Sequence, residues 1–169
     1  MKRNKGYTMI EMIIVITIMA ILSGLAAVSV GLIRKAKIQD AVTTFDSQLT
    51  NLWMSTKSIS SDQKTMKAQL TLESSTDSIT GAAQQVYVWK ITDGTTEVSK
   101  TTYDKWYKYV TIKYKGAECD TTGWTIQFDK STGAVVAGNG SGDYVFEDKS
   151  GKEVATVHLD AVTGNHYIK

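Results

Sequence analysis

A long run of apolar residues lies near the start of the chain. Residues 12–33 contain no charged side chain, and a helix of this length would extend about 33 Å. That distance is close to the ~30 Å hydrocarbon core of a bilayer, so the run predicts a single membrane-crossing helix. A cleavable secretory signal fits less well, because its apolar core is only roughly 7 to 15 residues long.

The helical pattern continues beyond the apolar run. Large apolar residues recur at intervals of three, four and seven, which places them on one face of a helix: Ile38, Val42, Phe45, Leu49, Leu52 and Ile59. No proline or glycine lies between Gly31 and Gly81, so nothing forces an earlier end. We therefore expect one helix from about Thr8 to Ser58, with its second half packed on a globular layer. A coiled-coil seam between subunits is the alternative for this face.

Short β-branched and aromatic runs bounded by turn residues begin at Gln84. They predict an antiparallel sheet with strands at residues 85–92, 105–114, 124–129, 134–137, 144–148, 153–160 and 165–168. Residues 61–83 are mostly polar and are expected to connect the helix to this sheet. The predicted fold class is α+β, with a long amino-terminal α-helix packed against an antiparallel β-sheet.

Three segments that start with aspartate and end with glycine suit tight turns. They are D-K-S-T-G at 129–133, D-K-S-G at 148–151 and D-A-V-T-G at 160–164. An aspartate carboxylate can accept hydrogen bonds from nearby backbone N–H groups, and glycine can adopt the left-handed conformation that closes such a turn. Each segment is therefore expected to form a hairpin turn.

Charge is distributed unevenly along the 169 residues. Of the 19 basic residues, six flank the apolar run: Lys2, Arg3, Lys5, Arg34, Lys35 and Lys37. Beyond Ile38, 13 basic residues remain against 16 acidic ones, so this part is mildly acidic and argues against a mainly nucleic-acid-binding protein. The single cysteine, Cys119, excludes an internal disulfide and a cysteine-cluster metal site.

The amino-terminal segment carries a specific combination of residues. K-G-Y-T-M-I-E-M-I-I-V-I-T-I-M-A-I-L at 5–22 joins Gly6, the aromatic Tyr7 and Glu11 to the apolar run, after a short basic leader. In this combination it resembles the amino terminus of type IV prepilins and type II secretion pseudopilins. The resemblance implies cleavage after Gly6 by a prepilin peptidase, N-methylation of Tyr7, and filament assembly that depends on Glu11.

This resemblance also implies a pilin-like organisation of the chain. Residues 1–6 would be the leader, 7–33 the transmembrane and filament-core half of the helix, 34–60 its packed half, and 61–169 the globular β-sheet domain. Glu11 would pair with the new amine of Tyr7 when helices pack side by side, which would offset the burial of both charges. A glutamate that stays among the lipid headgroups is the alternative.

The function that the resemblance implies is a non-enzymatic structural subunit of a type IV pilus. Before assembly it would cross the bacterial cytoplasmic membrane once, and afterwards it would lie at the cell surface or in an extracellular filament. Its partners would be the prepilin peptidase and other pilin or pseudopilin subunits. The alternatives are a pseudopilin of a type II secretion or DNA-uptake machine, and an unrelated single-pass protein that anchors a β domain.

Residues that could carry catalysis, a cofactor or a metal form no recognised pattern. His158 and His166 match no metal-protease, phosphate-loop or nucleophile-elbow motif. Four carboxylates could provide oxygen ligands for calcium, although their spacing fits no EF-hand: Asp143, Glu147, Asp148 and Glu153. We therefore predict no catalytic residue, no cofactor and no metal.

Residues 105–115 alternate in a way that predicts two faces of a strand. Trp106, Val110 and Ile112 would face the helix. The opposite face would form an exposed row of cations and rings that could contact a polyanion such as nucleic acid: Lys105, Tyr107, Tyr109, Lys113 and Lys115. An ordinary solvated face is the favoured alternative, because the domain as a whole is acidic.

Overall fold

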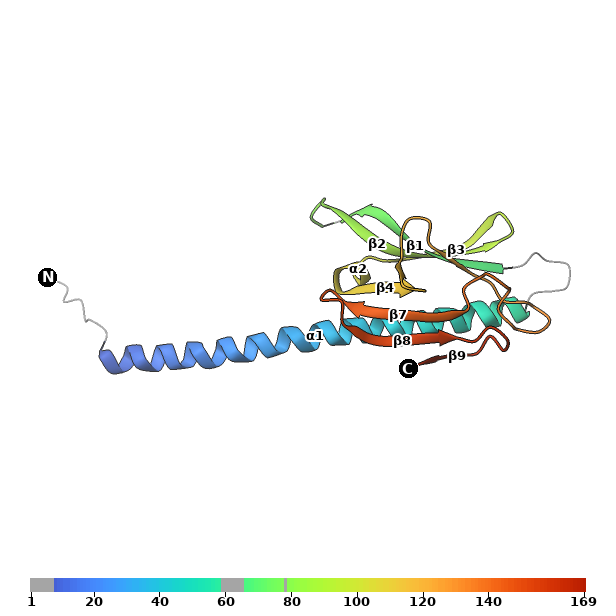
Figure 1. Cartoon of the computed structure of the whole chain (residues 1–169). Coiled ribbons are helices and arrows are strands. Elements are labelled where there is room, and N and C mark those ends of the chain that lie inside the picture. The colour runs from blue at the N-terminus through green and yellow to red at the C-terminus, as the bar shows by residue number, and fades with distance from the viewer. Residues whose placement is uncertain (1–7, 59–65, 78) are drawn as a thin grey trace. The chain divides into compact units, whose positions relative to one another are not determined.

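The computed structural model describes residues 8–58, 66–77 and 79–169, with the side chains of residues 25–30 excepted. Helix α1 extends over Met9–Ser58 and has 50 residues, which confirms the predicted helix (Figure 1). The chain forms two compact units, Met1–Ala36 and Lys37–Lys169, and α1 contributes residues to both.

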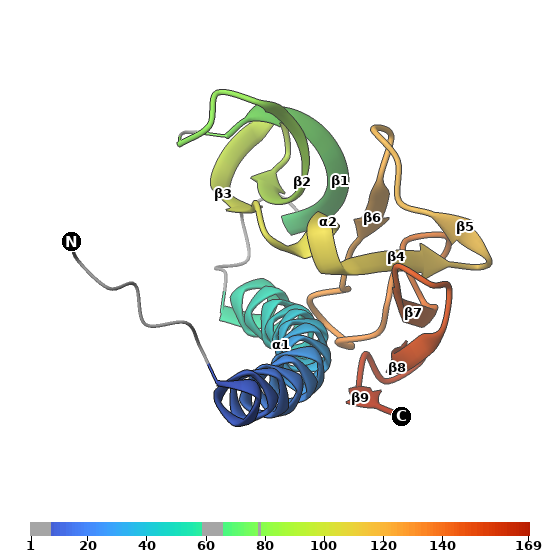
Figure 2. The same ribbon diagram turned by 90° about the vertical axis from the view of Figure 1, so that its left-hand side faces the viewer.

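Two antiparallel sheets make up most of the second unit (Figures 1 and 2). The first has the strand order β3-β2-β1-β6, with bounds Thr96–Tyr103, Ala83–Asp93, Met66–Thr76 and Trp124–Ile126. The second has the order β5-β4-β7-β8-β9, with bounds Ala117–Glu118, Val110–Tyr114, Gly142–Asp148, Glu153–Leu159 and His166–Ile168. The short helix α2, Trp106–Tyr109, connects the two sheets. The predicted α+β class with antiparallel pairing is confirmed, but the β part contains two sheets instead of one.

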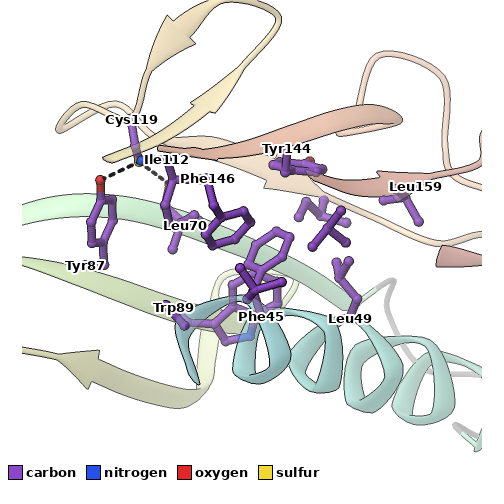
Figure 3. Close-up of a cluster of buried hydrophobic side chains, with 14 of the residues drawn as sticks. Phe45, Leu49, Leu70, Tyr87, Trp89, Ile112, Cys119, Tyr144, Phe146 and Leu159 are labelled. Atoms are coloured by element: carbon purple, nitrogen blue, oxygen red, sulfur yellow. Dashed lines mark hydrogen bonds between the residues drawn. The ribbon is translucent and has the colours of Figure 1, made fainter. Parts of the chain in front are cut away.

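The second half of α1 packs its apolar face between these sheets. Phe45 lies at the centre, with its ring 5.8 Å from Trp89 of β2, 5.0 Å from Tyr144 of β7 and 5.5 Å from Phe146 of β7 (Figure 3). The predicted helical face is buried at every position that the structure describes: Ile38, Val42, Phe45, Leu49 and Leu52. Ile59 lies outside the described residues. This face therefore packs on sheets of the same chain.

Hydrogen bonds join the first sheet to β4 and to the segment after β5. The backbone N–H of Ile112 in β4 donates to the hydroxyl of Tyr87 in β2 at 3.1 Å. The thiol of Cys119 donates weakly to the carbonyl oxygen of Leu70 in β1 at 3.6 Å (Figure 3). Burial raises the pKa of the Cys119 thiol to about 12, so this cysteine is an inert core residue.

The polar connection predicted at residues 61–83 is wrong for residues 66–76, which form β1 between β2 and β6. Ala68 and Leu70 are fully buried on the side of the core, and the polar Gln69 and Glu73 lie half-buried on the other side. A strand with one solvated face carries many polar residues, and here they outnumber the apolar ones. Residues 61–65 and Ser78 of the predicted connection lie outside the described residues.

The continuous strand predicted at 105–114 is also wrong, because only β4 continues it and residues 106–109 form α2. The Trp106 ring stacks on Tyr103 with centroids 3.8 Å apart, and this contact buries Trp106 where the chain passes from the first sheet to the second. Strands β3 and β5 were not predicted. The predicted strand at 134–137 is reduced to one isolated bridge between Val135 and Phe128.

The three predicted turns are confirmed. At 129–133, the Asp129 carboxylate accepts the backbone N–H of Thr132 at 2.8 Å, and the N–H of Gly133 donates to the carbonyl oxygen of Asp129 at 2.8 Å. The turns at 148–151 and 160–164 use their aspartates in the same way and connect β7 to β8 and β8 to β9. A further turn of this kind at 77–81 connects β1 to β2.

Candidate functional site

The start of α1 is stabilised by Thr8. The backbone N–H of Glu11 donates to the Thr8 hydroxyl at 3.3 Å, and the N–H of Met12 donates to the Thr8 carbonyl at 3.2 Å. The spacing T-x-x-E at residues 8–11 is that of a capping box, a signal that the sequence analysis missed. It places Glu11 in the first helical turn, where the positive end of the helix dipole favours a carboxylate. Gly6 and Tyr7 lie outside the described residues.

The helix that follows exposes apolar side chains in every direction. From Met9 to Ile33, each large apolar side chain that the structure describes is exposed, with fractions from 42% at Val15 to 87% at Met9. Ile13, Ile14, Val15 and Ile16 are consecutive, so these side chains surround the helix and do not form one stripe. A helix that is apolar all round requires a lipid or protein environment that covers it.

The polar side chains within this segment bond to their own helix. The Thr17 hydroxyl donates to the carbonyl oxygen of Ile13 at 2.8 Å, and the Ser23 hydroxyl donates to that of Met19 at 2.7 Å. A hydroxyl satisfied within its own helix can lie in an apolar environment at little cost. The surface that this segment offers to a neighbour is therefore almost entirely apolar.

Within the residues whose side chains are described, no helix has an apolar stretch long enough to cross a membrane. The predicted span at 7–33 includes residue 7 and the side chains of residues 25–30, which lie outside the described part. The transmembrane segment and its boundaries therefore stay predictions.

The row predicted at residues 105–115 does not form one exposed face. Lys105, Tyr107 and Tyr109 lie at or within α2, and Lys113 lies on β4, where its ammonium pairs with the Glu147 carboxylate at 2.8 Å. Lys115 adopts a left-handed conformation, with φ of 51°, in the turn after β4. Since the helical turn of α2 breaks the period of two, the geometric basis of this prediction is wrong. A polyanion contact at these residues stays a prediction.

The candidate calcium carboxylates are engaged elsewhere. Asp143 pairs with the Nδ1 atom of His158 at 2.5 Å and with the ammonium of Lys169 at 3.1 Å, and both contacts lower the pKa of its carboxyl. Asp148 closes its turn, Glu147 pairs with a lysine, and Glu153 accepts the Thr156 hydroxyl at 2.7 Å. In the part of the chain that the structure describes, no three His, Cys, Asp or Glu side chains converge as metal ligands.

A family model described as the prokaryotic N-terminal methylation motif matches residues 1–27. No curated protein and no solved structure matches the chain. The motif implies processing by a prepilin peptidase and assembly with other pilin-like subunits. The chain therefore carries, in residues 1–27, the amino-terminal signal of the type IV pilin and pseudopilin family.

Proposed function

We propose that this protein is a structural subunit of a type IV pilus, cleaved after Gly6, N-methylated at Tyr7 and assembled through the first half of α1. The observation that supports this best is the helix segment that follows the methylation motif, with apolar side chains exposed on all sides. In a membrane, lipid would cover this surface. In a filament, only the helices of neighbouring subunits can cover it.

Glu11 has a specific role in this proposal. Cleavage after Gly6 would leave a positively charged amine on Tyr7, just before the Thr8 cap. A carboxylate and an amine that are both removed from water are stabilised only if they pair, because an unpaired buried charge costs several kcal/mol. A subunit that enters the filament would therefore be held in axial register by the pairing of its charge with that of a neighbour.

Intact-mass measurement of the protein purified from membranes and from sheared filaments tests the processing. We expect a chain that begins at Tyr7 and is one methyl group heavier than the unmodified sequence. A strain without prepilin peptidase is the control and should yield the full chain from Met1. An intact Met1 start in the wild-type strain, or a cut within the apolar run, would contradict the proposal.

Imaging of surface filaments in wild-type, deletion and complemented cells tests the type of assembly. Loss of the filaments on deletion and their return on complementation is the expected result. Wild-type filaments in the deletion strain, together with a loss of protein secretion or DNA uptake, would instead identify a pseudopilin.

A further inference from the structure

An open cavity of about 790 Å³ lies on the second unit, where three parts of the chain meet. Its lining combines Ser74 of β1, Gln84 and Gln85 of β2, Tyr107 and Lys108 of α2, and Lys149 of the turn after β7. The volume is within the range of about 300–1,000 Å³ that is usual for small-ligand sites. The sequence analysis missed this group, because these residues lie far apart along the chain.

Lys149 is the most constrained charge in the cavity. Its ammonium lies 4.2 Å from the centre of the Tyr107 ring and donates a hydrogen bond to the Thr111 hydroxyl at 3.2 Å. Burial lowers the pKa of this ammonium, and the charge of Glu118 acts in the opposite direction. The ring and the hydroxyl favour this position of an exposed side chain, so Lys149 offers a cation to a ligand on the cavity wall.

The two lysines of the cavity, Lys108 and Lys149, are not held by a carboxylate of the described chain. Lys90, Lys100, Lys113 and Lys169 each pair with a carboxylate, at distances up to 3.2 Å. Across the described residues, no carboxylate lies within 4.0 Å of the ammonium of Lys149 or of Lys108. Two lysines and one aspartate, Asp104, line the cavity, so the lining side chains carry one net positive charge. From outside the lining, the charges of Asp77 and Glu118 act on Lys108 and Lys149.

We propose that this cavity binds an acidic sugar unit of an anionic polysaccharide. The sugar carboxylate would lie against Lys149 and Lys108, through charge-assisted hydrogen bonds. The amides of Gln84 and Gln85, the Ser74 hydroxyl and the Asp104 carboxylate supply donors and acceptors that match sugar hydroxyls. A nucleic-acid backbone would bring a phosphate charge at every nucleotide and few hydroxyls. The Asp104 carboxylate and the two amides would then have few hydroxyl partners. This inference goes beyond the proposed assembly function and does not depend on the type of filament.

Titration of the full chain in detergent micelles, followed by the side-chain amide NMR signals of Gln84 and Gln85, tests the site. The probes are trigalacturonate, its trimethyl ester, which keeps the ring hydroxyls without the charge, and hexathymidylate. We expect trigalacturonate to shift both amides with a dissociation constant of about 1–10 mM. The ester and the oligonucleotide should bind about tenfold more weakly. The ester lacks the negative charge, and the oligonucleotide lacks the sugar hydroxyls.

Three variants assign the binding to this cavity. Lys149→Gln should weaken trigalacturonate binding about tenfold, the usual loss for one charge-assisted hydrogen bond. Lys152→Gln is the matched control, since it removes an exposed lysine of the same turn that does not line the cavity. If Lys149→Gln does not fold, Lys108→Gln replaces it and should also weaken trigalacturonate binding. The proposal is overturned by equal binding of acid and ester, by equal binding of hexathymidylate, by wild-type affinity in the lysine variants, or by no shift at about 20 mM.

Discussion

At the scale of single residues, Glu11 combines a local role with a proposed role in assembly. Glu11→Gln keeps the T-x-x-E/Q capping pattern with Thr8, so the start of α1 should be preserved. The amide cannot compensate a buried amine, and loss of one partner of a buried pair costs about 3–5 kcal/mol. We therefore expect normal cleavage after Gly6 and a filament yield at least about tenfold lower, measured by shearing and immunoblotting.

The control for this variant is Glu97→Gln, which removes an exposed carboxylate from β3 and should leave the filament yield unchanged. A full yield from the Glu11→Gln variant would show that assembly does not need the charge. Glu11 would then be an interfacial residue, as the alternative interpretation of the sequence holds.

Gly164 closes the last turn at a position where no larger side chain fits. Its φ is 69°, and a Cβ atom here would lie 2.0 Å from the carbonyl oxygen of Gly133 in another turn. Gly151 has a similar φ of 81°, but a Cβ atom there would meet open space. Both Gly→Ala variants bear the cost of the left-handed backbone, about 1–2 kcal/mol. Only Gly164→Ala also forces two turns apart.

We therefore expect Gly164→Ala to lower the free energy of unfolding by about 1–3 kcal/mol more than Gly151→Ala does. Urea denaturation of the full chain in detergent, followed by tryptophan fluorescence, measures this difference. Equal loss in the two variants would mean that the close approach of the two turns contributes nothing to stability.

At the scale of elements, the contact of α1 with both sheets depends on Phe45. Its ring touches one aromatic side chain of β2 and two of β7, so Phe45→Ala removes a contact with each sheet at once. Large-to-small changes of this kind in a core cost about 3–5 kcal/mol. Met54, on the same helix, is 57% exposed, and Met54→Ala should change stability by less than about 0.5 kcal/mol. Urea denaturation of both variants checks the prediction, and similar losses would contradict it.

The elements also differ in how well the sequence predicts them. The start of helix α1 is predicted to within a residue, and its continuation to Ser58 is predicted because apolar residues recur at intervals of three and four with no proline or glycine after Gly31. Strand β1 is missed, since only alternate residues such as Ala68 and Leu70 meet the core and the remainder are polar. The turn at 77–81 repeats the D-x-x-T-G pattern of two recognised turns, and it is the signal that would have revealed the hairpin of β1 and β2.

The cavity and the packing of the two sheets could not be predicted, because both depend on contacts between residues far apart in the sequence. Lys149, Tyr107 and Gln84 come together only through the order of the strands, which alternation along one strand does not encode. The crossing from the first sheet to the second at Trp106 depends on stacking with Tyr103, a contact between side chains that no periodicity signals. The amino-terminal segment was predictable because its information lies in consecutive residues.

At the scale of the whole molecule, turn aspartates make the second unit sensitive to acid. The pKa of the Asp129 carboxyl is lowered below its usual 3.8 mainly by the Ser131 hydroxyl, and that of Asp160 mainly by the backbone N–H of Thr163. The pKa of Asp148 is lowered in the same way by Ser150. A carboxyl whose pKa is lowered by folding adds stability above its unfolded pKa, and this stability is lost as the pH falls through the folded value.

The double variant Asp129→Asn with Asp160→Asn tests this origin of acid sensitivity. An asparagine side chain keeps an acceptor oxygen in each turn but cannot ionise. Above about pH 5 the variant should unfold at a lower urea concentration than the wild type, and the gap between the two midpoints should narrow steadily as the pH falls below about 4, because the stabilisation from the wild-type carboxylates is lost as the pH falls from the unfolded toward the folded pKa. Glu97→Gln controls for the loss of surface negative charge. Its urea midpoint should change with pH as steeply as that of the wild type. A constant gap between the double variant and the wild type at every pH would contradict the prediction, because the loss would then come from altered turn geometry and not from ionisation.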